Sequence, residues 1–249
     1  ALAVGLVTML LANAAGLLFD HMQLEPSVRD LAKGFVLITS AGLPLFALYR
    51  VLYGYSTSLN QTKPLMVIAL LSLGLNIVVN SLLVFGQLGF PRLGGLGCAW
   101  ATLITVAFNL LALILWMHRA SAYRATWPLG HFEPPHWPQI KSLLKLGLPI
   151  GVTYFAESSA FSLIALLIAE FGSTQMAAHQ IALNFTSLVF MVPLSLWLAL
   201  LTRVGQSLGA GDATLAGYQA WVGVAVGLVV APVSAAGMAL AATRIASAY

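Results

Sequence analysis

The sequence has very little charge. Asp, Glu, Lys and Arg make up 7% of its 249 positions, whereas a soluble domain carries about 25%. In their place, 60% of the residues are hydrophobic and the mean hydropathy is +0.93. This composition excludes a soluble globular domain and predicts an integral membrane protein.

Cysteine is almost absent too. The single Cys98 excludes an internal disulfide and a cysteine metal cluster, and we interpret it as a packing residue in a run of small side chains. His131 and His136 have no partner ligands at metal-like spacing. HExxH, GxSxG and Walker patterns are also missing, so we expect neither an enzyme nor a bound cofactor.

The net charge of +4 does not indicate a nucleic-acid partner, because the basic residues are scattered between apolar runs rather than gathered in a stripe. Those runs are continuous over about twenty residues, which predicts membrane-spanning helices rather than barrel strands. We therefore expect an all-α, polytopic transmembrane helical bundle with the bilayer as its surroundings. Seven spans are predicted, at about residues 1–19, 35–55, 65–85, 96–117, 143–168, 175–201 and 215–240.

One polar segment divides the spans. Residues 118–141 hold four prolines, three histidines and two tryptophans, which is typical of a linker. We predict three parts: 1–117 with four spans, a linker at 118–142, and 143–249 with three spans. Because the chain starts in an apolar run without Met and stops just after another, we expect an internal piece of a longer protein.

Basic residues mark the cytoplasmic side of a membrane protein. When the loops between successive spans are assigned to alternating sides of the membrane, the linker falls on the side with more basic residues. We therefore predict that the linker is cytoplasmic and that the chain lies in a plasma or bacterial inner membrane. The more basic side carries Arg50, Lys63, Arg119, Arg124, Lys141, Lys145 and Arg203, against Arg29, Lys33, Arg92 and Arg244 on the other side.

Glu157 lies near the middle of the span at 143–168, whereas we expect every other acid in or beside a loop. A charge at bilayer depth costs about 3 to 17 kcal/mol, depending on the scale, and persists mostly where ions or protons move. We interpret Glu157 as a titrating or Na⁺-binding group, with a permanently protonated structural acid as the alternative. Tyr154 shares its helix face and is a possible supporting oxygen, whereas Ser158 and Ser159 are expected to point elsewhere.

Asn76 and Asn80 lie four residues apart in the span at 65–85, so their amides share one helix face. They suit interhelical hydrogen bonds or the binding of a hard cation, and the sequence favours neither. In the span at 175–201 we interpret Phe190 and Trp197 as lipid-facing or packing residues. A pairing of His179 with Glu157 would need a tertiary proximity that the sequence does not define.

Four segments resemble the multidrug and toxic compound extrusion (MATE) family in its NorM-like branch. AAHQIALNFTSLVFMVPLSLWLALLTRVGQSLGAGD (177–212) is the most specific, and the others are KLGLPIGVTYFAESSAF (145–161), RVLYGYSTSLNQTKPLM (50–66) and LNIVVNSLLVFG (75–86). The resemblance implies that the chain supplies about helices three to nine of twelve, in a fold of two six-helix lobes joined by the linker.

The resemblance also implies a function: export of amphipathic, usually cationic compounds by antiport with Na⁺ or H⁺. Glu157 falls on the acid of the family's second-lobe cation site, and Asn76 and Asn80 fall on the asparagine pair of the first-lobe site. The acids that partner these residues in the family, on its first and tenth helices, are absent from this chain. We expect a monomer.

Two other functions stay open. A flippase for lipid-linked oligosaccharides would share the two-lobe plan, but it usually has a more basic cavity than these spans offer. In a non-transporting membrane subunit, Glu157, Asn76 and Asn80 would only hold helices together.

Overall fold

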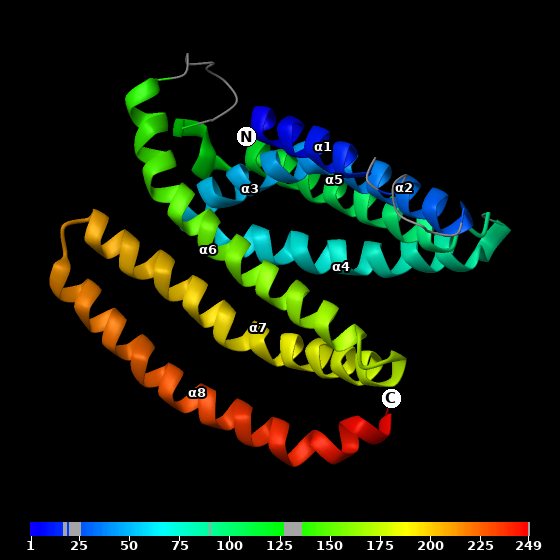
Figure 1. Cartoon of the computed structure of the whole chain (residues 1–249). Coiled ribbons are helices and arrows are strands. Elements are labelled where there is room, and N and C mark those ends of the chain that lie inside the picture. Colours follow the sequence, from blue (N-terminus) through cyan, green and yellow to red (C-terminus); the bar gives the residue numbers. More distant parts are fainter. Residues whose placement is uncertain (17–18, 20–25, 90, 127–135, 249) are drawn as a thin grey trace. The chain divides into compact units, whose positions relative to one another are not determined.

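The computed structural model describes residues 1–16, 19, 26–89, 91–126 and 136–248 (Figure 1). The chain divides into two compact units, Ala1–His131 and Phe132–Tyr249. The described residues form helices and short connections, with no strand among them, which confirms the all-α prediction. His131 lies outside the described residues.

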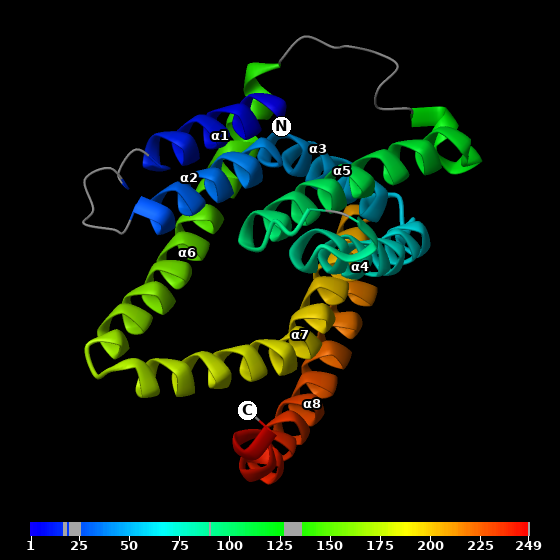
Figure 2. The ribbon, with the colours of Figure 1, turned by 90° about the vertical axis from the view of Figure 1, so that its right-hand side faces the viewer.

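The described residues of the first unit include five α-helices and the 3₁₀ turns η2 and η3. Helix α1 packs against α2 and α3, while α5 contacts α2, α3 and α4 (Figure 2). The helices are α1 (Leu2–Gly16), α2 (Pro26–Ala41), α3 (Leu43–Ser58), α4 (Thr62–Phe85) and α5 (Gly95–Arg119), and the turns are η2 (Gln87–Gly89) and η3 (Ser121–Thr126).

Glycines allow α4 and α5 to form a tight hairpin. Gly86 ends α4 in the left-handed conformation at φ 70°, which costs glycine little because it has no Cβ. At the start of α5, a Cβ on Gly97 would lie 2.6 Å from the Leu83 carbonyl oxygen. Small residues of this kind let membrane helices approach closely. The close approach brings the polar side chains of α4 within reach of α5.

The core of the first unit lies where α3, α4, α5 and η3 meet. Tyr123 and Leu113 are fully buried there, and the ring of Tyr123 lies 6.1 Å from that of Tyr55. Tyr123 thereby anchors the segment that follows α5 to the helices before it. The buried core residues are Leu52, Leu65, Ile68, Leu110, Leu113, Met117 and Tyr123.

Over its described residues, the second unit consists of three long helices: α6 (Trp137–Ala169), α7 (Ser173–Gly209) and α8 (Ala213–Ala248). Helix α7 packs along α8, while α6 meets α7 beside their connecting turn and diverges from it (Figures 1 and 2). Gly172 and Gly211, at φ 107° and 81°, make the two turns. Asp212 Oδ1 accepts a hydrogen bond of 2.8 Å from the Leu215 amide and so caps α8.

Over the described residues, each expected span is largely helical, with two differences in detail. Six helical stretches among the described residues are long and apolar enough to cross a membrane, and α1, with 15 residues, is shorter. The expected span at 35–55 lies within one of these stretches, Val28–Ser58, which starts earlier than expected. This stretch is divided into α2 and α3 at Gly42, two residues before Pro44, which lacks an amide hydrogen. Asp30 therefore lies within α2 rather than in a loop.

Candidate functional site

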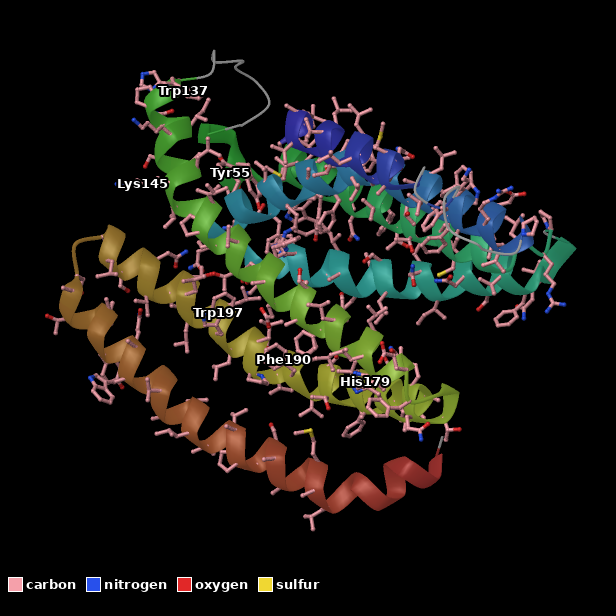
Figure 3. All side chains as sticks on the ribbon, in the orientation of Figure 1. Tyr55, Trp137, Lys145, His179, Phe190 and Trp197 are labelled. Atoms are coloured by element: carbon pink, nitrogen blue, oxygen red, sulfur yellow. The ribbon has the colours of Figure 1, made fainter. Side chains whose placement is uncertain are left out.

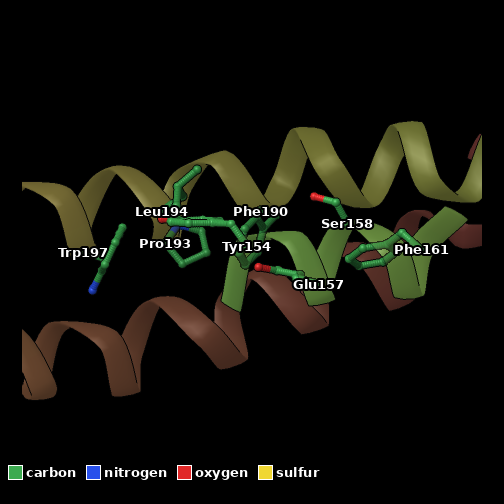
Figure 4. Close-up of a pocket in the computed structure, with 8 residues that line it drawn as sticks. All are labelled: Tyr154, Glu157, Ser158, Phe161, Phe190, Pro193, Leu194 and Trp197. Atoms are coloured by element: carbon green, nitrogen blue, oxygen red, sulfur yellow. The ribbon is translucent and has the colours of Figure 1, made fainter. Parts of the chain in front are cut away.

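Glu157 lines a pocket within the second unit, between α6 and α7. The pocket has a volume of about 510 Å³ and a largely apolar wall (Figure 4). Helix α6 contributes Tyr154, Glu157, Ser158 and Phe161, and α7 contributes Phe190, Pro193, Leu194 and Trp197.

Glu157 brings a carboxylate into an aromatic setting. Phe161 and Trp197 stand at opposite ends of the pocket, with Glu157 between them (Figure 4). In the part of the chain that the structure describes, the Glu157 carboxylate has no hydrogen-bond or ion-pair partner, and its side chain is exposed. An unpaired acid beside aromatic faces suits a bound cation, by charge attraction and by cation–π contact.

The pocket corrects one expectation and extends another. Ser158 lines it together with Glu157 and Tyr154, so the expectation that Ser158 points elsewhere is wrong. Residues at i and i+1 can both border a pocket when it is as wide as the space between two diverging helices. Phe190 and Trp197, which we interpreted as lipid-facing or packing residues, border the same pocket.

His179 lies on α7 nearer the α6–α7 turn than Phe190 and Trp197 (Figure 3). It does not line the Glu157 pocket. Its Nε2 is buried and has no hydrogen-bond partner among the described residues. The structure therefore does not bring His179 and Glu157 together.

Asn76 and Asn80 belong to a hydrogen-bonded chain that joins α4 to α5 in the first unit. Asn80 Nδ2 donates to Asn76 Oδ1 at 3.0 Å, and Asn76 Nδ2 donates to Thr105 Oγ1 at 3.0 Å. The Thr105 hydroxyl donates to the Ala101 carbonyl oxygen at 2.7 Å. The three polar side chains are half-buried. The pair expected on one face of α4 is thus also an interhelical link.

Sequence reasoning missed two polar residues of α5, Thr105 and Asn109. Asn109 lies one turn beyond Thr105, and its Oδ1 is buried without a hydrogen-bond partner in the described part of the chain. Their spacing of four residues within an apolar span was the available signal, the same pattern that singled out Asn76 and Asn80.

The described residues offer oxygen ligands rather than a transition-metal centre. Nowhere in the described ranges do three His, Cys, Asp or Glu side chains gather closely enough to hold a metal ion. Carboxylate, amide and hydroxyl oxygens are ligands for hard cations. In the second unit Glu157, Tyr154 and Ser158 supply such oxygens, and in the first unit Asn80 does.

The long apolar helices, with an acid in one span and an amide network in another, define a multi-pass membrane protein. The sequence model of the MatE family matches residues 1–82 and 149–249. The chain belongs to the MatE family, a family of transporters rather than enzymes.

Curated relatives agree with this assignment. A probable multidrug resistance protein NorM of Chromobacterium violaceum is 42% identical over 229 residues, which cover 92% of this chain and 49% of that protein. Multidrug resistance protein PmpM of Pseudomonas aeruginosa is 46% identical over 208 residues (84% and 44%). A probable NorM of Geobacillus kaustophilus is 42% identical over 248 residues (98% and 53%). The chain spans about half the length of these relatives. Its apolar helices and its bacterial relatives together identify it as a multi-pass protein of a bacterial inner membrane.

Proposed function

We propose that this chain is part of a secondary active multidrug efflux transporter. The complete protein exports amphipathic, cationic compounds by antiport with Na⁺ or H⁺, through alternating access of two lobes. In this proposal the first unit belongs to one lobe and the second unit to the other, with the linker at 118–142 on the cytoplasmic side. The protein acts as a monomer and needs no cofactor besides the coupling ion.

The observation that carries the proposal is the Glu157 carboxylate, which lies in an aromatic pocket on a membrane-spanning helix and has no hydrogen-bond or ion-pair partner among the described residues. A purely structural acid would be expected to have a hydrogen-bond partner, because an unsatisfied polar group in an apolar environment is costly. An acid without one is available to a proton, to Na⁺ or to a cationic compound. The names of the relatives, which describe multidrug resistance proteins, support the same function.

In this proposal Glu157 couples the flow of Na⁺ or H⁺ to the export of the drug. Binding of the ion neutralises the carboxylate and favours the conformation that releases the drug outward. Because coupling between two ligands is reciprocal, a bound drug must weaken the affinity for the ion by the same factor. Asn76 and Asn80 form the corresponding polar site of the first unit.

The test is Glu157→Gln in the complete transporter, with efflux of a fluorescent cationic dye measured in inside-out vesicles under imposed Na⁺ and pH gradients. We expect ion-driven efflux to fall to the level of vesicles without the transporter, because a neutral amide neither titrates nor carries the charge. Glu170→Gln, at the exposed C-terminal end of the same helix, is the matched control and should transport as the unmodified protein does. Unaltered ion-driven efflux by Glu157→Gln would contradict the proposal.

The same vesicles distinguish the alternatives. A non-transporting subunit would show no ion-driven dye movement in the unmodified protein. A flippase would lose dye efflux in competition with a lipid-linked sugar, whereas a drug exporter would not.

A further inference from the structure

We infer that Thr105 sets the direction of the hydrogen-bonded chain on α4 and α5 and, through Asn76, leaves the carbonyl oxygen of Asn80 as the ligand atom of the first unit. Thr105 is a positioning residue and Asn80 the ligating one. The inference rests on the proposed function, since it assigns roles within the site that is proposed to bind the coupling ion.

The Thr105 hydroxyl has one proton. That proton is directed at the Ala101 carbonyl oxygen, 2.7 Å away on the preceding turn of α5. A carbonyl oxygen cannot donate, so the direction of this bond is unambiguous. Toward Asn76, therefore, Thr105 Oγ1 can only accept.

The orientation of Asn76 follows. A carboxamide carries a donor nitrogen on one side and an acceptor oxygen on the other. Because Thr105 accepts, the Asn76 nitrogen must face α5, where it lies 3.0 Å from Thr105 Oγ1. The Asn76 oxygen then faces along α4 and accepts from Asn80 Nδ2 at 3.0 Å.

The hydrogen-bonded chain ends at Asn80. Its nitrogen is committed to Asn76, and its Oδ1 accepts no hydrogen bond from the described residues. Asn76, in contrast, uses both its nitrogen and its oxygen within the chain. Of the two asparagines expected to share a role, only Asn80 presents an uncommitted oxygen. That oxygen suits a hard positive group: Na⁺ itself, or the O–H of a carboxylic acid that has taken up the transported proton.

The test replaces Thr105 in the complete transporter and measures dye efflux against Na⁺ concentration and, in a parallel series, against pH. Thr105→Val keeps the shape of the side chain but removes the acceptor, so Asn76 and Asn80 lose their fixed orientation. If Na⁺ drives transport, we expect the Na⁺ concentration for half-maximal efflux to rise about three- to tenfold. This change corresponds to the free energy of one interhelical hydrogen bond. If protons drive transport, the midpoint of the pH profile should move by about half to one unit instead.

Two further variants separate positioning from general packing. Thr105→Ser retains the hydroxyl and should restore the ion dependence of the unmodified protein. Thr39→Val is the matched control: Thr39 is half-buried in the same unit, and its hydroxyl donates only to the Phe35 and Val36 carbonyls of its own helix. It should leave the ion dependence unchanged. For all three variants, the dye KM should stay within about twofold.

A double-mutant cycle tests whether Thr105 acts through Asn80. In an Asn80→Ala background, Thr105→Val should produce no additional shift, because the ligating oxygen is already gone. Full additivity, or an unchanged ion dependence in Thr105→Val, would overturn the inference while leaving the result for Glu157→Gln, and hence the proposed function, untouched. If Thr105→Val fails to assemble in detergent, the smaller Thr105→Ala provides the same readout.

Discussion

Asn76 on α4 and Thr105 on α5 are joined by a hydrogen bond of 3.0 Å that crosses the interface between the two helices. The bond places the Asn76–Asn80 pair at the end of a network that begins at a backbone carbonyl of α5. The two asparagines therefore differ in their contacts. Asn76 links the two helices, whereas the Asn80 oxygen accepts no hydrogen bond from the described residues.

Replacing Gly97 should weaken the α4–α5 hairpin. In Gly97→Ala, the new Cβ would lie 2.6 Å from the Leu83 carbonyl oxygen, so the helices must move apart. We expect a loss of about 1–3 kcal/mol in stability, typical of overpacking, and with it a lower midpoint of thermal unfolding in detergent. Gly74→Ala, on α4 with no atom within 4 Å of the new Cβ, is the control and should keep the midpoint. Equal midpoints for both variants would show that the close approach is not needed.

Trp197→Ala should reduce the affinity for cationic aromatic dyes. The indole forms one end of the Glu157 pocket, and a cation–π contact contributes about 0.5–2 kcal/mol, so the KM for dye efflux should rise about two- to thirtyfold. The ion concentration for half-maximal efflux should not change, because Glu157 is retained. Trp221→Ala, at a position 75% exposed on α8 and outside the pocket, provides the comparison. A similar KM for the two variants would argue against dye binding at this end of the pocket.

Tyr123→Phe should stabilise the first unit or leave it unchanged. The hydroxyl of Tyr123 is buried without a hydrogen-bond partner among the described residues, and such a group costs about 1–3 kcal/mol. Removing it keeps the ring in the core beside Tyr55, whereas Tyr123→Ala should lose about 3–5 kcal/mol by leaving a cavity. Thermal unfolding of both variants in detergent measures the difference. Clear destabilisation by Tyr123→Phe would mean that the hydroxyl has a partner in the complete transporter.

Much of the fold could be predicted because membrane insertion depends on local composition. A helix that crosses a bilayer must be apolar over about twenty consecutive residues, and such runs can be read directly from the chain. The expected span at 65–85 differs from α4 by three residues at its start and ends at the same residue. The break at Gly42 was missed because hydropathy is continuous across it and does not depend on whether a residue, such as Pro44, lacks an amide hydrogen.

The candidate site could be predicted only in part. An acid or an amide pair within an apolar run stands out in the sequence, so Glu157, Asn76 and Asn80 could be named as candidates. Other residues were missed or interpreted differently, namely Thr105, Ser158, Phe190 and Trp197. Threonine, serine and aromatic residues are common in membrane helices as packing or lipid-facing residues, so they do not stand out in the sequence. Their importance depends on which neighbour they face.

The sequence by itself determined the class of this protein, the positions of its helices and the residues whose polarity is costly in a bilayer, since each of these follows from the side chains of one contiguous segment. Only the tertiary structure decided that Glu157 lines an aromatic pocket with Ser158 and Trp197. It also decided that Asn76 donates to Thr105, while the Asn80 oxygen accepts no hydrogen bond from the described residues. The physical reason is that burial and hydrogen bonding are properties of pairs. Asn76 and Thr105 are 29 residues apart in the sequence and lie on different helices. Whether two such residues meet depends on how their helices cross.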